Sequence, residues 1–371
     1  ADNAISYIGD LKSNDPDKPF FCYLTFGAHH SPHQVPRPYI DRYKGKFDEG
    51  WDIYREKVFK KQKELGIIPQ DCELPEVDYV SPKWETLSEK EKRVLAKYME
   101  VYAGFVSHTD AQIGRVVDYL KKIGQYDNTI IVFLSDNGAS AEGGRWGTRS
   151  FAYHYITEQD PPLISEEETE LLGSEDVKCH YPSGWARASN APLRMYKSWN
   201  HCGGIKVPCI ITWPEKIKDK GGIREQYHHV IDINPTVLEI CGIEPPARIN
   251  GVDQAPKHGV SMAYTFDKPA EKTRRHVQYY EMVGNRGIWA DGWKAVADHA
   301  VNPTFDFDKD VWELFHTDTD FTESKNVADK YPEKLRELID LWWHEAGKYG
   351  VLPLAESHLK RAEDFNSKKM Y

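Results

Sequence analysis

The sequence predicts an α/β fold with a central, largely parallel sheet, followed by a small α+β subdomain with an antiparallel sheet. The first part is predicted by unbroken apolar runs that end in turn residues, typical of strands buried on both faces, and by a long amphipathic helix between two of them. The second is predicted by short strands separated by glycine-containing turns after Arg274. We expect the boundary near Lys272, giving domains 1–272 and 273–371.

Composition limits the classes of function. A net charge of −10 over 371 residues argues against nucleic acid as a partner, and no apolar run reaches the length of a membrane span. The six cysteines form no C-x-x-C pair, which argues against a structural zinc site. Cys22, Cys209 and Cys241 lie within apolar runs, so we expect them to be buried thiols.

The run Ile130–Leu134 is apolar without alternation and stops at Ser-Asp-Asn-Gly. A buried strand that ends here places Asp136 and Asn137 at the carboxyl edge of the sheet, where α/β proteins bind ligands. Carboxylate and amide oxygens suit calcium or magnesium. A simple tight turn is the alternative, because Asn-Gly is a common turn dipeptide.

A second apolar run, Phe20–Phe26, leads into a proline-restrained stretch with three histidines, His29, His30 and His33. Histidine is the usual side chain for proton transfer near neutral pH. The alternative is that these rings only hydrogen-bond the loop backbone. A third run, Val207–Trp213, also predicts a buried strand.

The helix between the first two runs is predicted from Glu89 to about Ile123, with Ser88 as N-cap and Glu91 completing a capping box. The segment Ala139–Trp185 is polar and shows no steady period, as is typical of lids and substrate rims. After it, Lys197 could place a cation near an anionic group, although most lone lysines are solvated surface charges.

The C-terminal part is predicted to form short strands joined by Gly-Asn and Asp-Gly turns, and then a proline-initiated helix. The expected elements are Val277–Met282, Arg286–Ala290, Trp293–Ala297, Trp312–Phe315 and the helix Tyr331–Lys348.

Several of these motifs, in this order, resemble the sulfatase family, in particular bacterial-type arylsulfatases. The matching stretches are GAHHSPHQVP at 27–36, VFLSDNG at 132–138, Tyr196-Lys197 ahead of GGIKVP at 203–208, and the C-terminal strands and helix. The resemblance implies an alkaline-phosphatase-like sulfatase sandwich and a calcium-dependent sulfuric ester hydrolase. It implies that Asp136 and Asn137 bind one calcium ion, and that His30 and Lys197 are catalytic and substrate-binding residues.

Two family motifs are missing from the sequence. There is no C-x-P/A-S-R motif, whose cysteine or serine becomes the formylglycine nucleophile, and no early Asp-Asp pair to complete the calcium site. The chain also opens at Ala1 without an initiator methionine. We therefore expect the C-terminal two-thirds of a sulfatase, inactive alone, with formylglycine in the missing N-terminal segment.

The expected substrate is a small-molecule or carbohydrate sulfate ester, with no nucleic acid partner. The family resemblance implies a periplasmic or secreted location, and a cytoplasmic one stays open. The alternatives are a phosphate or phosphonate monoester hydrolase of the same superfamily, and a non-catalytic binding protein with this fold.

Overall fold

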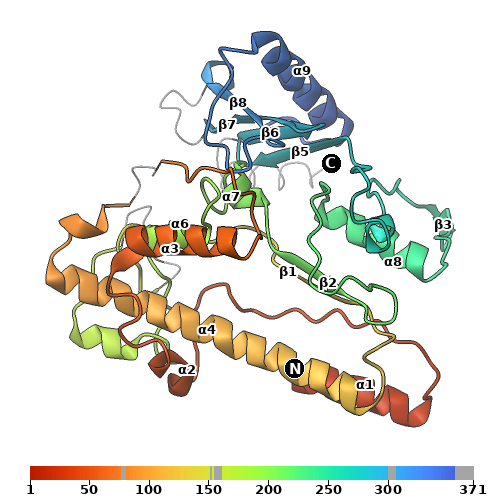
Figure 1. Cartoon of the computed structure of the whole chain (residues 1–371), viewed down its shortest axis with the longest axis horizontal. Helices are drawn as coiled ribbons and strands as arrows, with labels where there is room; N and C mark the ends of the chain where they lie inside the picture. Colours follow the sequence, from red (N-terminus) through yellow and green to blue (C-terminus); the bar gives the residue numbers. More distant parts are fainter. Residues whose placement is uncertain (77–80, 151–152, 154–160, 300–305, 356–371) are drawn as a thin grey trace. The chain divides into compact units, whose positions relative to one another are not determined.

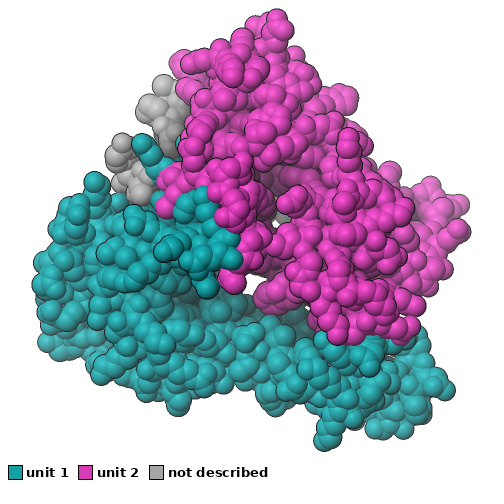
Figure 2. Space-filling model, viewed as in Figure 1, with its two compact units in different colours: residues 1–64, 76–129, 138–197 teal, residues 65–75, 130–137, 198–371 magenta. Residues whose placement is uncertain are grey.

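The computed structural model describes residues 1–76, 81–150, 153, 161–299 and 306–355. Contacts divide the chain into two compact units, each with its own hydrophobic core. Unit 1 comprises residues 1–64, 76–129 and 138–197, and unit 2 comprises residues 65–75, 130–137 and 198–371 (Figure 2). The domain boundary expected near residue 272 stays a prediction.

Unit 1 is built mainly from helices and the loops between them (Figure 1). Its elements are α1 (Asp2–Asn14), α2 (Arg37–Asp41), α3 (Gly50–Glu64), η1 (Trp84–Thr86), α4 (Glu89–Lys122), η2 (Glu167–Leu171) and α6 (Ser183–Ser189). None of the helices in the described residues is both long and apolar enough to cross a membrane.

The longest helix, α4, begins where its capping signals predicted. The Ser88 hydroxyl accepts a hydrogen bond from the Glu91 amide at 3.3 Å, and the Glu91 carboxylate accepts one from the Ser88 amide at 2.7 Å. These two bonds satisfy amide groups that have no partner within a helix's first turn. The capping box predicted from the sequence is therefore confirmed.

Three tryptophans from different elements form the centre of the unit 1 core. Trp51 of α3 meets Trp84 edge to face at 4.7 Å between ring centroids and Trp185 of α6 at 5.7 Å. The Trp185 indole N–H donates to the Leu95 carbonyl of α4 at 2.8 Å, so this buried polar group is satisfied. Gly184 allows this approach, since a Cβ atom there would lie 2.4 Å from the Trp51 ring.

Unit 2 contains two small strand pairs, several short helices and a four-stranded antiparallel sheet with the order β5-β6-β7-β8 (Figure 1). The first elements are β1 (Ile131–Leu134), α7 (Cys202–Ile205), β2 (Cys209–Thr212), η3 (Val230–Asp232), α8 (Ile233–Ile240), β3 (Arg248–Ile249), β4 (Val252–Asp253) and η4 (Ala263–Phe266). The sheet region adds β5 (Val277–Met282), β6 (Asn285–Ala290), β7 (Trp293–Ala297), η6 (Phe307–Lys309), β8 (Trp312–His316) and α9 (Pro332–Lys348). The strands and helix predicted for the C-terminal part are confirmed.

The β5–β8 sheet has two chemically different faces. On one face Ala295 and Leu314 are paired across β7 and β8 and pack in a core with Trp342 of α9. Because side chains alternate along a strand, the opposite face carries Lys294 of β7 and Glu313 of β8.

All three predicted buried strands differ in the structure. Residues 20–26 form no strand, and Phe21 and Tyr23 are 80% and 83% exposed. The run at 130–134 does give β1, but β1 pairs antiparallel with β2, and Ile210 of β2 is 60% exposed. An apolar run becomes a buried strand only when other strands and helices cover it, and among the described residues these runs lack that cover.

The expectation about cysteine burial was wrong for the same reason. Cys22, Cys209 and Cys241 are exposed free thiols. Each lies in an apolar run, but the burial of such a run depends on its tertiary neighbours. The other three cysteines, Cys72, Cys179 and Cys202, are buried, and none of them forms a disulfide in the described structure.

Candidate functional site

The histidine-rich loop of unit 1 gives its three rings different environments. His29 packs edge-on against Tyr102 and Phe105 of α4, and burial lowers its pKa. His33 is 1% exposed, and burial followed by neighbouring histidines lowers its pKa far below the usual value. His30 differs, because 53% of its side chain is exposed. Of the three, His30 is the most exposed to solvent.

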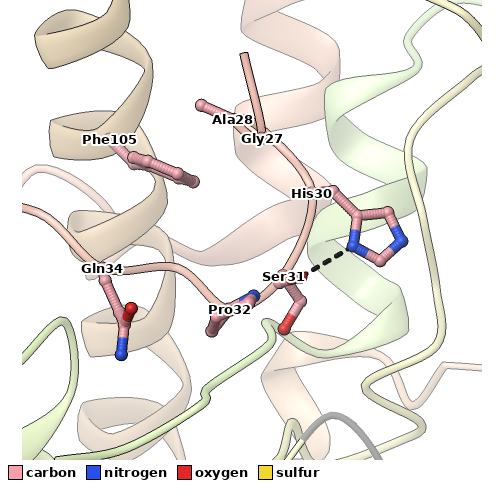
Figure 3. Close-up of a pocket in the computed structure, with 7 residues that line it drawn as sticks. All are labelled: Gly27, Ala28, His30, Ser31, Pro32, Gln34 and Phe105. Atoms are coloured by element: carbon pink, nitrogen blue, oxygen red, sulfur yellow. Dashed lines mark hydrogen bonds between the residues drawn. The ribbon is translucent and has the colours of Figure 1, made fainter. Parts of the chain in front are cut away.

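The ring of His30 is oriented by the loop backbone. Its Nδ1 lies 2.7 Å from the Ser31 carbonyl oxygen (Figure 3). Since a carbonyl can only accept, Nδ1 carries the proton and donates. In the neutral ring Nε2 then has a lone pair, and it accepts from the Lys197 ammonium at 3.4 Å. His30 and Lys197, both predicted as site residues, therefore lie together in unit 1.

A third charged group, Glu142, completes this cluster. Its carboxylate lies 2.9 Å from Lys197 Nζ and 3.7 Å from His30 Nε2. Glu142 was not predicted as a site residue, because it lies in the polar segment after Asp-Asn-Gly where no periodicity points to a function. The only signal in the sequence is an acid shortly after that motif.

Backbone hydrogen bonds hold the two segments of the cluster against each other. The Lys197 amide donates to the Ala139 carbonyl at 2.9 Å, and the Ala139 amide donates to the Asn190 side chain at 2.9 Å. The Ser140 hydroxyl donates to the Glu142 carboxylate at 2.9 Å. The positions of Lys197 and Glu142 thus depend on loop contacts that reach back to the end of α6.

The site lies beside an open hollow of about 530 Å³ in unit 1. Its lining residues come from the histidine loop and α4: Gly27, Ala28, His30, Ser31, Pro32, Gln34 and Phe105. In Figure 3 the rings of His30 and Phe105 lie on opposite sides of the loop backbone. Phe105 therefore gives the hollow an apolar wall, and the ring of His30 lies on the other side of the loop from it.

A buried histidine, His180, contacts the cluster of His30, Lys197 and Glu142 through Ser140. His180 is 1% exposed, its Nδ1 contacts the Tyr181 carbonyl at 2.9 Å, and its Nε2 contacts the Ser140 hydroxyl at 3.0 Å. Burial lowers its pKa to about 4. The ring is therefore neutral at pH 7, and its Nε2 and the Glu142 carboxylate are alternative acceptors for the single proton of the Ser140 hydroxyl.

Acid should destabilise unit 1 through His180. Its folded pKa of about 4 lies below the usual 6.5, so the unfolded chain binds the proton first, and stability falls as pH drops from about 6.5 towards 4. We expect a loss of roughly 2 to 3 kcal/mol at pH 4.5 relative to pH 7. This loss of unfolding free energy can be measured by urea unfolding at both pH values, with tryptophan fluorescence as the signal. His180→Gln should show a clearly smaller loss, and an unchanged loss in this variant would contradict the assignment.

The predicted metal ligands lie in unit 2, at the end of β1. Asp136 is exposed, Asn137 is half-buried, and the Ser135 hydroxyl donates to the Asn137 carbonyl at 3.0 Å. Two oxygen-bearing side chains suit a hard cation. Calcium takes six to eight oxygen ligands, so Asp136 and Asn137 could supply only some of the ligands of a calcium ion. Among the described residues, Asp136 does not belong to any set of three or more histidine, cysteine or acidic side chains whose ligand atoms lie close enough together to bind one metal ion.

Comparison with known families decides the identity of the chain. The profile for the sulfatase family matches residues 1–243. The chain belongs to the sulfatase family. A second profile, for the C-terminal part of N-sulphoglucosamine sulphohydrolase, matches residues 195–341 of this sulfatase chain.

Curated relatives agree with this assignment. An uncharacterised sulfatase of Schizosaccharomyces pombe is 35% identical over 93% of this chain and 61% of its own length. An arylsulfatase of Klebsiella aerogenes is 32% identical over 68% of this chain and 53% of its own length. The sulfatase chain thus spans between about half and three-fifths of the length of these two relatives.

Solved structures show the same fold. Ps i-CgsB aligns with a TM-score of 0.55 at 19% identity, over 97% of this chain and 56% of its own. The phosphonate monoester hydrolase of Agrobacterium radiobacter aligns with a TM-score of 0.50 at 17% identity, over 93% of this chain and 59% of its own. The predicted α/β sulfatase-type fold is therefore confirmed.

Proposed function

We propose that this chain is the C-terminal portion of a calcium-dependent sulfuric ester hydrolase of the arylsulfatase type. The observation that carries the proposal is the meeting of an exposed imidazole, an ammonium and a carboxylate at His30, Lys197 and Glu142 beside an open hollow. The relatedness to an arylsulfatase at 32% identity supports the choice of ester.

In this proposal Lys197 binds a sulfate oxygen. Its ammonium lies 2.9 Å from the Glu142 carboxylate, and its side chain is only 20% exposed, so the lysine is oriented before the substrate arrives. A preorganised cation stabilises the charge that develops on the sulfuryl oxygens in the transition state. Before the substrate binds, Glu142 orients the lysine and balances part of its charge. When the substrate enters, its sulfate takes the place of Glu142 as the anion beside the Lys197 ammonium.

His30 acts on the oxygen that leaves. Because Nδ1–H is committed to the Ser31 carbonyl, Nε2 is the atom that faces the site, next to Lys197. Protonated at Nε2, the ring can donate to the departing alkoxide or phenoxide as a general acid. The apolar wall of the hollow at Phe105 suits an aryl or sugar leaving group.

The remaining chemistry comes from groups that these residues do not supply. Calcium, held in part by Asp136 and Asn137, would neutralise sulfate oxygens, and formylglycine in an N-terminal segment would supply the attacking oxygen. We propose that such a segment of a longer protein also covers the exposed apolar runs at 20–26 and in β2, since apolar surface of this kind marks an interface.

The test is an aryl sulfate assay on the 371-residue chain and on a longer protein that adds the preceding segment with formylglycine formed. We expect turnover by the longer protein, its loss on calcium chelation and in Asp136→Asn, and no turnover by the chain alone. Comparable turnover by both would mean that a nucleophile lies within these residues. No turnover by the longer protein, with intact ligand binding, would favour a non-catalytic binding protein.

A second candidate is a phosphonate or phosphate monoester hydrolase. The similar fold of the Agrobacterium radiobacter phosphonate monoester hydrolase favours keeping it, and the cluster of His30 and Lys197 would bind a phosphonate oxygen equally well. An aryl phosphonate ester assayed beside the aryl sulfate separates the two. A higher kcat/KM for the phosphonate would reassign the substrate class.

A further inference from the structure

A second open hollow of unit 1, of about 360 Å³, is formed by the turn before α3 and by α3 itself, within residues 43–61. It shares no lining residue with the hollow beside His30. Three aromatic rings and three ammonium groups line it, those of Tyr43, Phe47, Tyr54, Lys46, Lys57 and Lys61. We propose that this hollow binds a sugar ring that carries an anionic group, either a sulfate or a carboxylate.

Burial divides the lining of this second hollow into a floor and a rim. Phe47 is 5% exposed, and Tyr43 and Tyr54 are half-buried. The Phe47 ring meets Tyr54 edge to face at 5.5 Å between centroids and stacks on Tyr43 at 6.2 Å. The three lysines are all exposed. An entering ligand therefore meets aromatic rings at the bottom of the hollow and ammonium groups at its opening.

The turn that carries Lys46 is fixed on α4. The Gly45 amide donates to the Glu100 carboxylate of α4 at 2.7 Å, and the φ of Gly45 is +73°, a conformation that favours glycine. The Tyr43 hydroxyl is hydrogen-bonded to the Ser107 hydroxyl, also on α4. The floor and the turn are therefore in place before a ligand arrives, which favours binding because little further order is required.

The charges around the hollow favour an anion. Residues 41–63 contain eight lysines and arginines against five acidic residues, although the whole chain has a net charge of −10. Within the described part of the chain Lys46 forms no ion pair, and its ammonium lies 5.3 Å from the Tyr43 ring centroid. Glu49, the carboxylate in the lining, is paired with Lys57, whose side chain is 63% exposed. Such exposed pairs contribute at most about 1 kcal/mol, so Lys57 is free to turn to a bound anion.

The combination of rings and ammonium groups favours an anionic sugar over a simple anion. Ammonium groups alone would bind inorganic sulfate, whereas a sugar also offers C–H faces that pack on aromatic rings and hydroxyls that form hydrogen bonds. The Tyr54 hydroxyl forms no hydrogen bond with the residues that the structure describes. Burial raises the pKa of Tyr54, so this hydroxyl keeps its proton and can donate to a sugar hydroxyl. The volume suits one ring, at the lower end of the range for small-molecule sites.

This site goes beyond the proposed hydrolysis. Phe105, which lines the first hollow, and Ser107, which contacts Tyr43 of the second, are two residues apart on α4. Residues at this spacing point to nearly opposite sides of a helix, so a ligand in the second hollow leaves His30 and Lys197 open. The role of the site would be to hold an anionic glycan on unit 1. It is tested by binding alone, so a failed hydrolysis assay does not decide it.

The test is saturation-transfer NMR on the 371-residue chain, with glucose 6-sulfate, glucuronic acid and glucose as probes. We expect a Kd of about 1 mM for at least one of the two anionic sugars and binding of glucose that is weaker by about fivefold or more. Inorganic sulfate should compete only at about tenfold higher concentration. Lys46→Ala and Tyr54→Phe should each weaken binding of the anionic sugar about fivefold, the usual effect of one lost hydrogen bond or exposed charge.

The matched control is Lys60→Ala, which removes the same charge from an exposed position of α3 outside the lining. Unchanged binding in Lys60→Ala and in Lys197→Ala supports the proposed site. Binding that is lost in Lys197→Ala but kept in Lys46→Ala would place the sugar at the catalytic cluster and overturn it. Absence of binding, or equal binding of glucose and the anionic sugars, also overturns it. Tighter binding of benzenesulfonate would assign the hollow to an aromatic anion instead.

Discussion

Replacing Lys197 by alanine is expected to lower kcat/KM for aryl sulfate hydrolysis by about 10²–10³-fold in the longer protein, the usual cost of one preorganised charge-stabilising group. The ammonium is placed by its backbone bond to Ala139 and by Glu142, so no other described side chain of unit 1 takes its position. Most of the loss should appear in kcat, because the sulfuryl oxygens gain charge in the transition state. Initial rates with 4-nitrophenyl sulfate measure it.

Lys60→Ala, at an exposed position on α3, is the matched control and should leave the rate unchanged. Glu142→Gln tests the origin of the effect, since it keeps a hydrogen-bond acceptor for Lys197 but removes the charge. We expect a loss smaller than that of Lys197→Ala. A rate within about twofold of wild type in Lys197→Ala would show that the cluster is not the catalytic site.

Replacing Lys294 by methionine is expected to cost unit 2 about 3–5 kcal/mol of unfolding free energy, as when one partner of a buried ion pair is removed. Lys294 and Glu323 are both 1% exposed, and the ammonium lies 2.5 Å from the carboxylate. Burial acts to raise the pKa of Glu323, but the charge of Lys294 and the hydrogen bonds hold it below the usual value. Without Lys294, the buried carboxylate loses its counter-ion.

A double variant, Lys294→Met with Glu323→Gln, separates charge from packing. The glutamine oxygen can still accept from the Cys202 amide, which now donates to Glu323 at 2.6 Å, so most of the loss should be recovered. The single variant should also be less destabilised at pH 5 than at pH 7, because its carboxyl can then take up a proton. Urea unfolding followed by circular dichroism checks both. Equal losses in single and double variants would show that packing dominates.

Sequence reasoning succeeded where the signals were local. The start of α4 follows from Ser88 and Glu91, three residues apart, and the β6–β7 hairpin follows from Asp291-Gly292. Both turn residues have positive φ, 43° and 83°, as the two-residue hairpin turn requires. Such elements need no knowledge of the rest of the chain.

Sequence reasoning failed where burial or contact depends on distant partners. An apolar run such as 20–26 has the composition of a core strand whether or not other strands cover it. Glu142 reaches Lys197 from 55 positions away in a segment without periodicity, and Asp298 and Glu313 are neighbours only through the register of β7 and β8. No pattern within a short stretch of sequence predicts contacts between residues so far apart in the chain.

The opposite chemistry of the two sheet faces restricts how the length of this chain can vary. Side chains alternate along β7, with Ala295 towards α9 and Lys294 on the charged face. Insertion or deletion of one residue within the strand would exchange the faces of every residue beyond it, bringing the ammonium against Trp342 and moving the alanine to Glu323. Length changes in this subdomain should therefore be confined to its loops, and a strand should tolerate two added residues better than one.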